Sequence, residues 1–310
     1  MGHCRGGVQC LYMSEFADAP PRLNVGVIGT GRAGSVLGAA LRRAGHPVVA
    51  AHGVSDLSRV RAEALLPGVE LTDPLTVIER ADLVLLTVRD DSLAEVVHGL
   101  AVQGAIRVGQ LFMHASGRYG VEVLDAITRC GALPLALHPV MTFTGTSIDL
   151  ARLDGCPFGI TSPDELRPIA EALVVEMGGE PVWVPEESRA LYHAALAHGS
   201  NHLMALVAQT LGVLAEAKID DPARLVGPLL HASLDNTLRL GDQSLTGPVA
   251  RGDARTVQAH LDVLREMSPD VLTTYIALAR TTADRALAAG VLRAEGAQAL
   301  LEVLSDEEAR

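Results

Sequence analysis

Short apolar runs alternate with amphipathic stretches over the first part of the chain. The apolar runs predict strands at residues 23–28, 47–51, 82–88, 111–114, 133–137, 158–161 and 181–184, and residues 69–71 could add a short one. Helical spacing fills most intervals, at residues 58–66, 92–100, 121–130 and 164–177. Strands that alternate with helices in this way predict an α/β fold with a doubly wound parallel sheet covered on both faces.

The strand pattern stops near residue 185, and helical spacing continues over residues 187–217, 223–240, 253–267 and 269–289. Ser268-Pro269 gives the last of these helices its start, and Gly290 gives it a stop. We therefore expect an α/β domain at residues 23–184 and an all-α domain at residues 185–310. Residues 1–22 show no periodicity and end in two prolines, so we interpret them as a disordered leader or an over-extended start, outside the fold.

A glycine-rich turn joins the first predicted strand to the first helix. It reads Gly29-Thr30-Gly31-Arg32-Ala33-Gly34. In this setting the first glycine permits a tight turn, the second lets a pyrophosphate approach the backbone, and the third lets helix and strand pack closely. Free N–H groups at the helix N-terminus would then meet the phosphate. The pattern predicts a Rossmann dinucleotide-binding domain, and a purely structural turn is the alternative.

Two further turns bear on the cofactor. Sites for NAD usually carry an acidic residue at the end of the second strand, where it binds the ribose hydroxyls. This strand carries no acid, whereas Ser55, Arg59 and Arg32 are available for a 2′-phosphate, so we expect NADP rather than NAD. Asp56 keeps NAD open, because the predicted end of the strand is only approximate. Thr87-Val88-Arg89 follows a later strand and would face the nicotinamide, although a solvated polar turn is an equal alternative.

Two histidines follow apolar strands at their carboxyl ends. His114 begins the segment His114-Ala115-Ser116-Gly117, and His138 precedes a proline at the end of the next strand. Each histidine alone is more often structural. Because parallel strands end at one edge of a sheet, however, both are candidates to line the same cleft, where a proton donor for a reduced carbonyl or imine is needed.

Polar side chains also interrupt the first long helix of the second domain. His193 and Ser200 are seven residues apart and share a helix face, with Asn201 nearby. Buried among leucines and alanines, these groups need partners or a cleft, and we favour the cleft. Arg251 closes a Gly-Pro-containing loop and is a candidate to hold a substrate carboxylate; a plain helix connection is the alternative. We expect no metal site, because the histidines lack an HExxH pattern or a companion carboxylate.

Composition narrows the classes of function. A net charge of −12 argues against a nucleic-acid-binding protein, because phosphates need a basic surplus. We find no secretory signal and no apolar run of membrane-spanning length, so we expect a cytoplasmic protein without a membrane partner. Lys218 is the only lysine of the chain, so proton transfer falls more naturally to histidine.

These motifs together resemble a family of Rossmann-like proteins with a C-terminal helical domain of formerly unknown function. The family lies in the superfamily around 6-phosphogluconate dehydrogenase, pyrroline-carboxylate reductase and prephenate dehydrogenase. The resemblance covers about residues 23–300 and implies an NADP-linked reductase, a homodimer through the helical domain, and an active site between the domains. Some relatives are thought to be alternative ketopantoate reductases of pantothenate biosynthesis. Several superfamily members use a lysine where this chain has His193, whereas prephenate dehydrogenases resemble it at Ser116 and His138.

We therefore expect an NADP-dependent oxidoreductase that reduces a small keto acid bearing a carboxylate, with 2-dehydropantoate as the named candidate. His193 or His138 would donate the proton, Asn201 and Ser116 would orient the substrate, and Arg251 would hold its carboxylate. His114 and Ser200 would complete the substrate site. Two alternatives stay open: a dinucleotide-binding sensor without catalysis, and an oxidoreductase that acts on imines or is linked to a deazaflavin.

Overall fold

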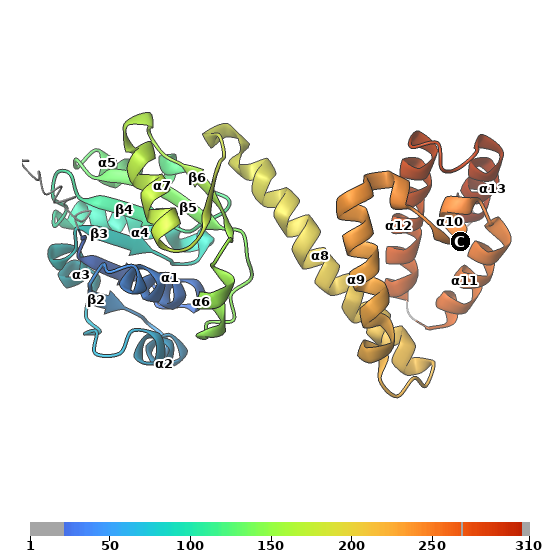
Figure 1. Cartoon of the computed structure of the whole chain (residues 1–310), viewed down its shortest axis with the longest axis horizontal. Helices are drawn as coiled ribbons and strands as arrows, with labels where there is room; N and C mark the ends of the chain where they lie inside the picture. The colour runs from blue at the N-terminus through green and yellow to red at the C-terminus, as the bar shows by residue number, and fades with distance from the viewer. Residues whose placement is uncertain (1–21, 268, 306–310) are drawn as a thin grey trace, which may run out of the picture. The chain divides into compact units, whose positions relative to one another are not determined.

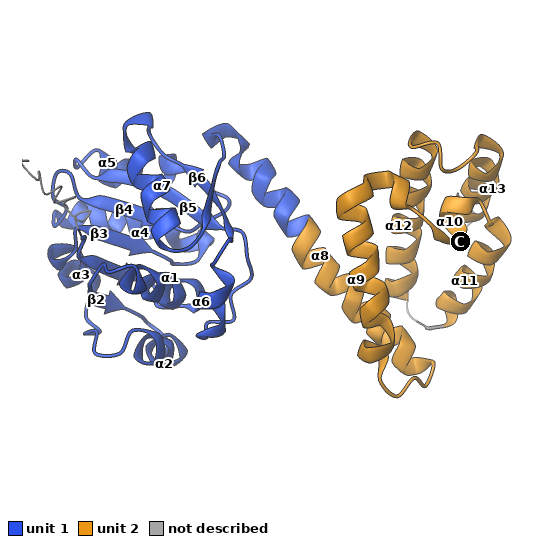
Figure 2. Ribbon diagram, viewed as in Figure 1, with its two compact units in different colours: residues 1–198 blue, residues 199–310 orange. Residues whose placement is uncertain are grey.

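A computed structural model describes residues 22–267 and 269–305, so nearly all of the predicted leader, together with Ser268, lies outside the described residues. The chain forms two compact units, residues 1–198 and 199–310 (Figure 2). They meet inside one long helix, α8 (Arg189–Glu216). The change from strands to helices falls before this helix, close to residue 185, but the first ten residues of α8 belong to the first unit.

A seven-stranded sheet forms the centre of the first unit (Figure 1). Its strands are β1 (Val25–Ile28), β2 (Val48–His52), β3 (Leu83–Leu86), β4 (Leu111–His114), β5 (Leu133–Pro139), β6 (Pro157–Thr161) and β7 (Glu180–Trp183). The order across the sheet is β2-β1-β3-β4-β5-β6-β7. The chain therefore reverses direction across the sheet between β1 and β3, which is where ligands bind in sheets of this class.

The sheet is mostly but not wholly parallel, since β6 pairs antiparallel with β5. The segment that joins these two strands contains only the five-residue helix α6 (Ile148–Arg152), which is too short to cross the sheet. The chain instead turns back at the same edge, where the Val140 N–H donates to the Pro157 carbonyl at 2.8 Å. The predicted strand at residues 69–71 is only an isolated bridge between Leu71 and Ala51.

Helices cover both faces of the sheet, as the alternation along the strands requires. The helices of this unit include α1 (Arg32–Arg43), α2 (Asp56–Leu65), α3 (Pro74–Arg80), α4 (Asp90–Gln103), α5 (Asp125–Thr128) and α7 (Arg167–Glu176). Val25 and Val27 point to one core cluster with α1 and α7, whereas Ile28 points to the other with α3 and α4. Successive strand residues therefore fill opposite layers, which explains why the strands are apolar throughout.

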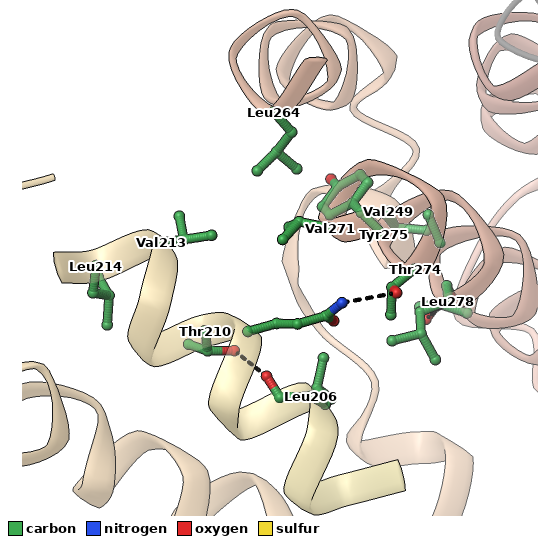
Figure 3. Close-up of a pocket in the computed structure, with 13 residues that line it drawn as sticks. Leu206, Thr210, Val213, Leu214, Val249, Leu264, Val271, Thr274, Tyr275 and Leu278 are labelled. Carbon is green, nitrogen blue, oxygen red and sulfur yellow. Dashed lines mark hydrogen bonds between the residues drawn. The ribbon is translucent and has the colours of Figure 1, made fainter. Parts of the chain in front are cut away.

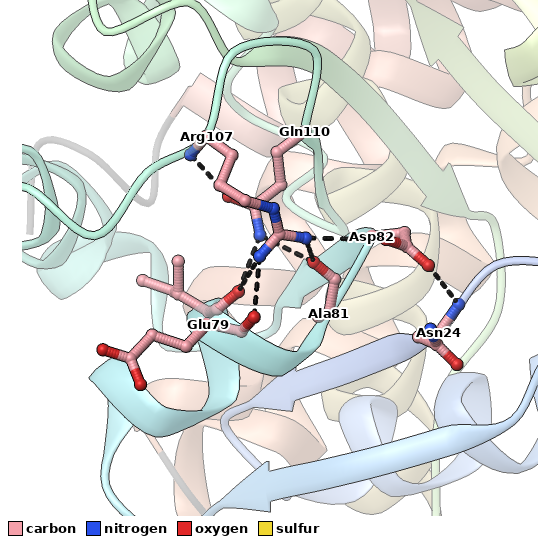
Figure 4. A network of polar contacts seen from close by, with 7 residues as sticks. Asn24, Glu79, Ala81, Asp82, Arg107 and Gln110 are labelled. Carbon is pink, nitrogen blue, oxygen red and sulfur yellow. Dashed lines mark hydrogen bonds and ion pairs between the residues drawn. The ribbon is translucent and has the colours of Figure 1, made fainter.

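The helix α3, which the hydrophobic pattern does not reveal, ends on side chains from a distant loop (Figure 4). The Gln110 Nε2 donates to the carbonyls of Ile78 at 2.7 Å and Ala81 at 2.8 Å. Arg107 adds a bond from Nη1 to the Glu79 carbonyl at 2.7 Å. Carbonyls at a helix C-terminus lack intrahelical partners, so these two side chains complete the end of α3 and fix it beside the sheet.

The second unit is helical. It contains the rest of α8 together with α9 (Pro222–Leu240), α10 (Gly247–Arg251), α11 (Ala254–Met267), α12 (Pro269–Ala288) and α13 (Ala294–Ser305). Leu261, Ala283 and Leu300 belong to its core, which α10 to α13 build. An apolar hollow of about 370 Å³ lies between α8 and α12, where Gln209 donates to Thr274 at 3.2 Å (Figure 3). None of the helices in the described part of the chain is long and apolar enough to span a membrane.

Candidate active site

The glycine-rich turn connects β1 to α1, as the sequence predicts. Gly29 has a φ of +102°, a conformation that favours glycine. A side chain on Gly34 would begin 2.1 Å from the Gly29 carbonyl oxygen, so only glycine lets α1 approach the loop. A side chain on Gly31 would meet nothing within 4 Å. The first and third glycines therefore serve the fold, and the second leaves open space above the turn.

This open space lies at a helix N-terminus that lacks its usual partners. No side chain caps α1, and its first turn carries no acidic residue. The Thr30 hydroxyl oxygen is buried and has no hydrogen-bond partner among the described residues. Buried polar groups without partners are rare, and bare helix N-termini attract phosphates. The turn is therefore chemically suited to the pyrophosphate of a dinucleotide, with Thr30, Arg32 and Ala33 at hand.

The end of β2 carries His52, and no acidic side chain lies on the strand. Ser55 caps α2, since its Oγ accepts from the Ser58 N–H at 3.2 Å, and Asp56 is only the first residue of that helix. A residue not singled out from the sequence is Arg61. A side chain on Gly145 would begin 2.8 Å from its Nε and 3.2 Å from the Arg32 Cα, so Arg61 reaches toward the glycine-rich turn.

The turn after β3 joins the glycine loop through one contact. The Thr87 hydroxyl donates to the Gly29 carbonyl at 2.7 Å. Val88 packs against the core cluster of the α3–α4 face. The exposed Arg89 guanidinium forms an ion pair with Asp91 at 2.8 Å, as a solvated turn would. Its expected contact with the cofactor stays a prediction.

His114 ends β4 and is completely buried. Its Nε2 lies 2.8 Å from the Gly120 carbonyl, and its Nδ1 accepts from the Ser116 N–H at 3.1 Å. These partners place the ring proton on Nε2, and burial lowers the pKa of His114 to about 4, which keeps the ring neutral. Both nitrogens are occupied, so His114 holds the following loop instead of binding substrate as we expected.

Ser116 organises the same loop. Its Oγ accepts from the backbone N–H groups of Arg118 at 3.2 Å and Tyr119 at 3.3 Å. The hydroxyl proton is not used in these bonds and can be donated elsewhere. Ser116 thus keeps a hydroxyl donor on a largely buried side chain, and its expected role of orienting a substrate stays a prediction.

Three ring side chains meet beyond this loop. Tyr192 and His193, at the start of α8, lie beside His138 at the end of β5. The Tyr192 hydroxyl lies 2.8 Å from the His138 Nδ1, and the two rings meet edge to face. The rings of His138 and His193 also meet edge to face, with centroids 6.3 Å apart. Neither the His138 Nε2 nor the ring nitrogens of His193 has a hydrogen-bond partner within the described ranges.

Two glycines make room for this cluster. A side chain on Gly117 would begin 2.9 Å from the His138 Nε2 and 2.8 Å from the His193 Cδ2. A side chain on Gly159, in β6, would begin closer still to the Tyr192 hydroxyl oxygen. The cluster therefore depends on glycines in two segments that are far from it in sequence.

Below the cluster lies a buried guanidinium that sequence reasoning missed. Arg189 donates from Nε to the Thr161 hydroxyl at 2.7 Å, and from Nη2 to the carbonyls of Ala136 and Gly159, each at 3.0 Å. Its Nη1 has no partner among the described residues, and it forms no ion pair with any carboxylate in that part of the chain. In the sequence, Arg189 is marked only as a charged residue at the start of a long apolar helix. This pattern is too common to identify a functional residue.

The cluster is electrostatically unusual. Burial, the Arg189 charge and the neighbouring imidazoles lower the pKa of His138 to about 4. Burial raises the pKa of Tyr192, although Arg189 opposes this shift. At neutral pH His138 is thus uncharged and Tyr192 keeps its proton. The edge of the sheet therefore carries a neutral imidazole with an unoccupied Nε2, beside an unpaired positive charge.

The remaining predicted residues belong to the second unit. Ser200 and Asn201 are exposed on α8, and Arg251 is exposed at the end of α10. Their expected roles toward substrate stay predictions. No group of three or more metal-binding side chains occurs among the described residues.

Comparison with known proteins agrees with the fold. A family model described as a Rossmann-like domain matches residues 13–139, and the family DUF2520, a domain of unknown function, matches residues 156–282. Its earlier part is therefore similar to Rossmann-like domains, and its later part is similar to DUF2520 domains. A search of curated proteins finds no match to this sequence.

Several solved structures are similar to this chain in fold. A "putative NADP oxidoreductase" from Bacteroides fragilis is 22% identical with a TM-score of 0.72, over 85% of this chain and 98% of that one. An imine reductase variant from Myxococcus stipitatus, in complex with NAD+, is 18% identical with a TM-score of 0.58, over 92% and 99%. A pyrroline carboxylate reductase from Plasmodium falciparum, with NADP bound, is 10% identical with a TM-score of 0.54, over 85% and 98%.

Proposed function

We propose that this protein is an oxidoreductase that uses a reduced nicotinamide dinucleotide, NADPH in preference to NADH. The observation that carries the proposal is the uncapped N-terminus of α1 beside the buried, unpartnered Thr30 hydroxyl. Those groups match a phosphate, and the similar solved structures include oxidoreductases bound to NADP or NAD+. When bound, such a cofactor supplies a hydride; the protein must supply the matching proton and hold the substrate.

The preference for NADPH rests on charge near the adenosine ribose. No acid lies on β2, and Arg32, Arg59 and Arg61 form no ion pair with a carboxylate in the described part of the chain. A 2′-phosphate is a dianion at neutral pH that guanidinium groups bind well, whereas NAD offers only a hydroxyl there. We therefore assign Arg32 and Arg61 to the 2′-phosphate and expect NADH to bind more weakly.

The substrate class we propose is a small keto acid, with 2-dehydropantoate as the first candidate. The resemblance of the motifs to alternative ketopantoate reductases suggests it, and His138 with Ser116 offers a donor for a carbonyl oxygen. A cyclic imine is the second candidate, because a pyrroline carboxylate reductase and an imine reductase are among the similar structures. Both reactions need one hydride and one proton, so the same edge of the sheet serves either.

The test is oxidation of NADPH followed by absorbance, with 2-dehydropantoate, other short keto acids and cyclic imines as substrates. Complementation of a pantothenate-requiring strain that lacks ketopantoate reductase asks the same question in cells. Tight NADPH binding without turnover on any substrate would instead favour a dinucleotide sensor. Failure to bind either dinucleotide would refute the proposal.

Gly31→Ala tests the cofactor site while it leaves the fold intact. The new methyl group meets nothing within 4 Å, so the fold should tolerate it, but it enters the space assigned to the pyrophosphate. We expect the Kd for NADPH, measured by fluorescence, to rise at least tenfold while the melting temperature stays the same. Unchanged affinity would show that the pyrophosphate does not bind at this turn.

A further inference from the structure

We propose that Tyr192 supplies, through the ring of His138, the proton that the reduced substrate takes up, and that buried Arg189 stabilises the tyrosinate left behind. The inference rests on the proposed reductase function and adds to it a relay of three side chains. The sequence predicts a histidine alone as the proton donor. The structure gives a reason why a second group must replace the proton that the histidine gives up.

The Tyr192–His138 pair has the geometry that a proton relay needs. Their hydrogen bond of 2.8 Å joins the phenol oxygen to Nδ1. A neutral imidazole carries one ring proton, so a phenol that donates to Nδ1 leaves that proton on Nε2. The Nε2 lies on the side of the ring that faces Gly117 and has no partner among the described residues. A substrate oxygen or nitrogen there would meet a donor.

The imidazole of His138 is uncharged before the reaction. Because the pKa of His138 is lowered to about 4, the ring carries no extra proton at neutral pH and cannot act as an imidazolium acid. Giving up its only proton without replacement would leave an imidazolate, which is very basic. The proton must therefore be replaced at Nδ1 as it leaves Nε2, and the Tyr192 hydroxyl is the group bonded there. The titratable and charged groups around this pair are Arg189, His193, His114 and Cys156.

The guanidinium of Arg189 has no carboxylate partner among the described residues. Arg189 is only 2% exposed, and its carbon Cζ lies 5.8 Å from the centre of the Tyr192 ring. The nearby carboxylate of Glu186 is bonded instead to the backbone N–H groups of Val121 and Glu122. A buried cation without a counter-ion is costly, so it favours an anion that forms beside it. Tyrosinate is such an anion, and it would exist only during the reaction.

The step balances in atoms and charge. When bound, a reduced nicotinamide dinucleotide would supply the hydride of the new C–H bond, and the electron pair of the carbonyl or imine π bond would move to its oxygen or nitrogen. That atom takes the Nε2 proton of His138, while Nδ1 takes the phenol proton as the O–H bond of Tyr192 breaks. The ring of His138 is neutral before and after, and solvent returns a proton to the tyrosinate before the next turnover.

Tyr192→Phe tests the relay, because it keeps the ring and removes only the hydroxyl. The second unit offers a matched control in Tyr275, whose hydroxyl lies 2.9 Å from the His260 Nδ1 with the rings edge to face. We expect Tyr192→Phe to lower turnover by about 10²-fold or more with an unchanged Kd for NADPH, and Tyr275→Phe to leave both unchanged. Turnover of Tyr192→Phe within threefold of wild type would overturn the relay.

Two readouts separate a relay from a merely structural role. In mixtures of H₂O and D₂O, the transfer of two protons should make the turnover rate of the wild-type protein a curved function of the deuterium fraction. Tyr192→Phe should give a straight line in the same plot. Nitrogen NMR of labelled histidine, on the protein without substrate, should place the His138 proton on Nε2. An active protein with that proton on Nδ1 refutes the relay alone. A protein that reduces no carbonyl or imine refutes the proposed function, and the relay with it.

Discussion

Replacing Gly117 with alanine should disable the site without unfolding the protein. The backbone of Gly117 does not need the left-handed conformation, so alanine brings no backbone strain. Its methyl group, however, would lie 2.9 Å from the Cε1 and Nε2 of His138 and 2.8 Å from the Cδ2 of His193. Ordinary contact begins near 3.4 Å, so both rings must retreat by about half an ångström or rotate.

A displacement of this size is enough to matter for catalysis. Moving a reacting group by about 1 Å can cost roughly 10²-fold in rate, so we expect Gly117→Ala to lower turnover by about 10-fold to 10²-fold. The melting temperature should fall only slightly, because both rings are partly exposed and can move toward solvent. The Kd for NADPH should not change, because the glycine-rich turn is not touched.

The assay compares kcat, KM and NADPH affinity in wild type, Gly117→Ala and Gly99→Ala. Gly99 lies in α4, and a side chain there meets nothing within 4 Å, so that variant controls for the loss of a glycine. Turnover of Gly117→Ala within twofold of wild type would refute the reasoning. It would mean that the positions of His138 and His193 do not limit the reaction.

Three further predictions concern stability and assembly. Gln110→Ala removes two hydrogen bonds to buried carbonyls at the end of α3, to which Arg107 also donates. The loss of these two bonds should cost about 1–3 kcal/mol of unfolding free energy, measured in urea, and a loss below about 0.5 kcal/mol would contradict the role of Gln110. The pKa of His114 is about 4 in the folded protein and 6.5 in its ordinary state, so below pH 6.5 the unfolded chain binds more protons. The free energy of unfolding should therefore fall as pH drops from 6.5 toward 4, and this histidine should contribute up to about 1.4 kcal/mol per pH unit. An unfolding free energy that stays constant over this range in urea titrations would exclude the lowered pKa of His114. We propose a homodimer through the helical unit, where Leu225, Leu229 and Leu238 are exposed on α9. Light scattering should give twice the 32.5 kDa mass of one chain, and Leu229→Glu should shift the measured mass toward that of the monomer.

The sheet could be predicted well from sequence, because buried parallel strands are continuous apolar runs. The run predicted at residues 111–114 is the strand Leu111–His114 itself. The short helices were harder: α3 and α10 have only seven and five residues, too few for a helical period to stand out. The end of α3 also depends on Gln110, about thirty residues along the chain, and no local pattern records such a partner.

In the candidate site, too, local sequence signals mark some residues and not others. His138 and His193 could be singled out because strand ends and polar breaks in an apolar helix are local signals. Tyr192 stands next to His193, yet its contact to His138 spans 54 residues, and nothing in the sequence says that the two side chains meet. Arg189 was missed for a similar reason, since its partners lie on β5 and β6.

His114 and His138 show most clearly what the sequence could not decide. Both lie at the ends of neighbouring strands after apolar runs, and both have a pKa lowered to about 4. The difference lies in their partners. Both nitrogens of His114 are bonded within its own loop, so the ring can give nothing to a ligand without breaking that loop. His138 is bonded only at Nδ1, to a phenol that can itself lose a proton. Of the two, only His138 can pass a proton outward and recover it from within the protein.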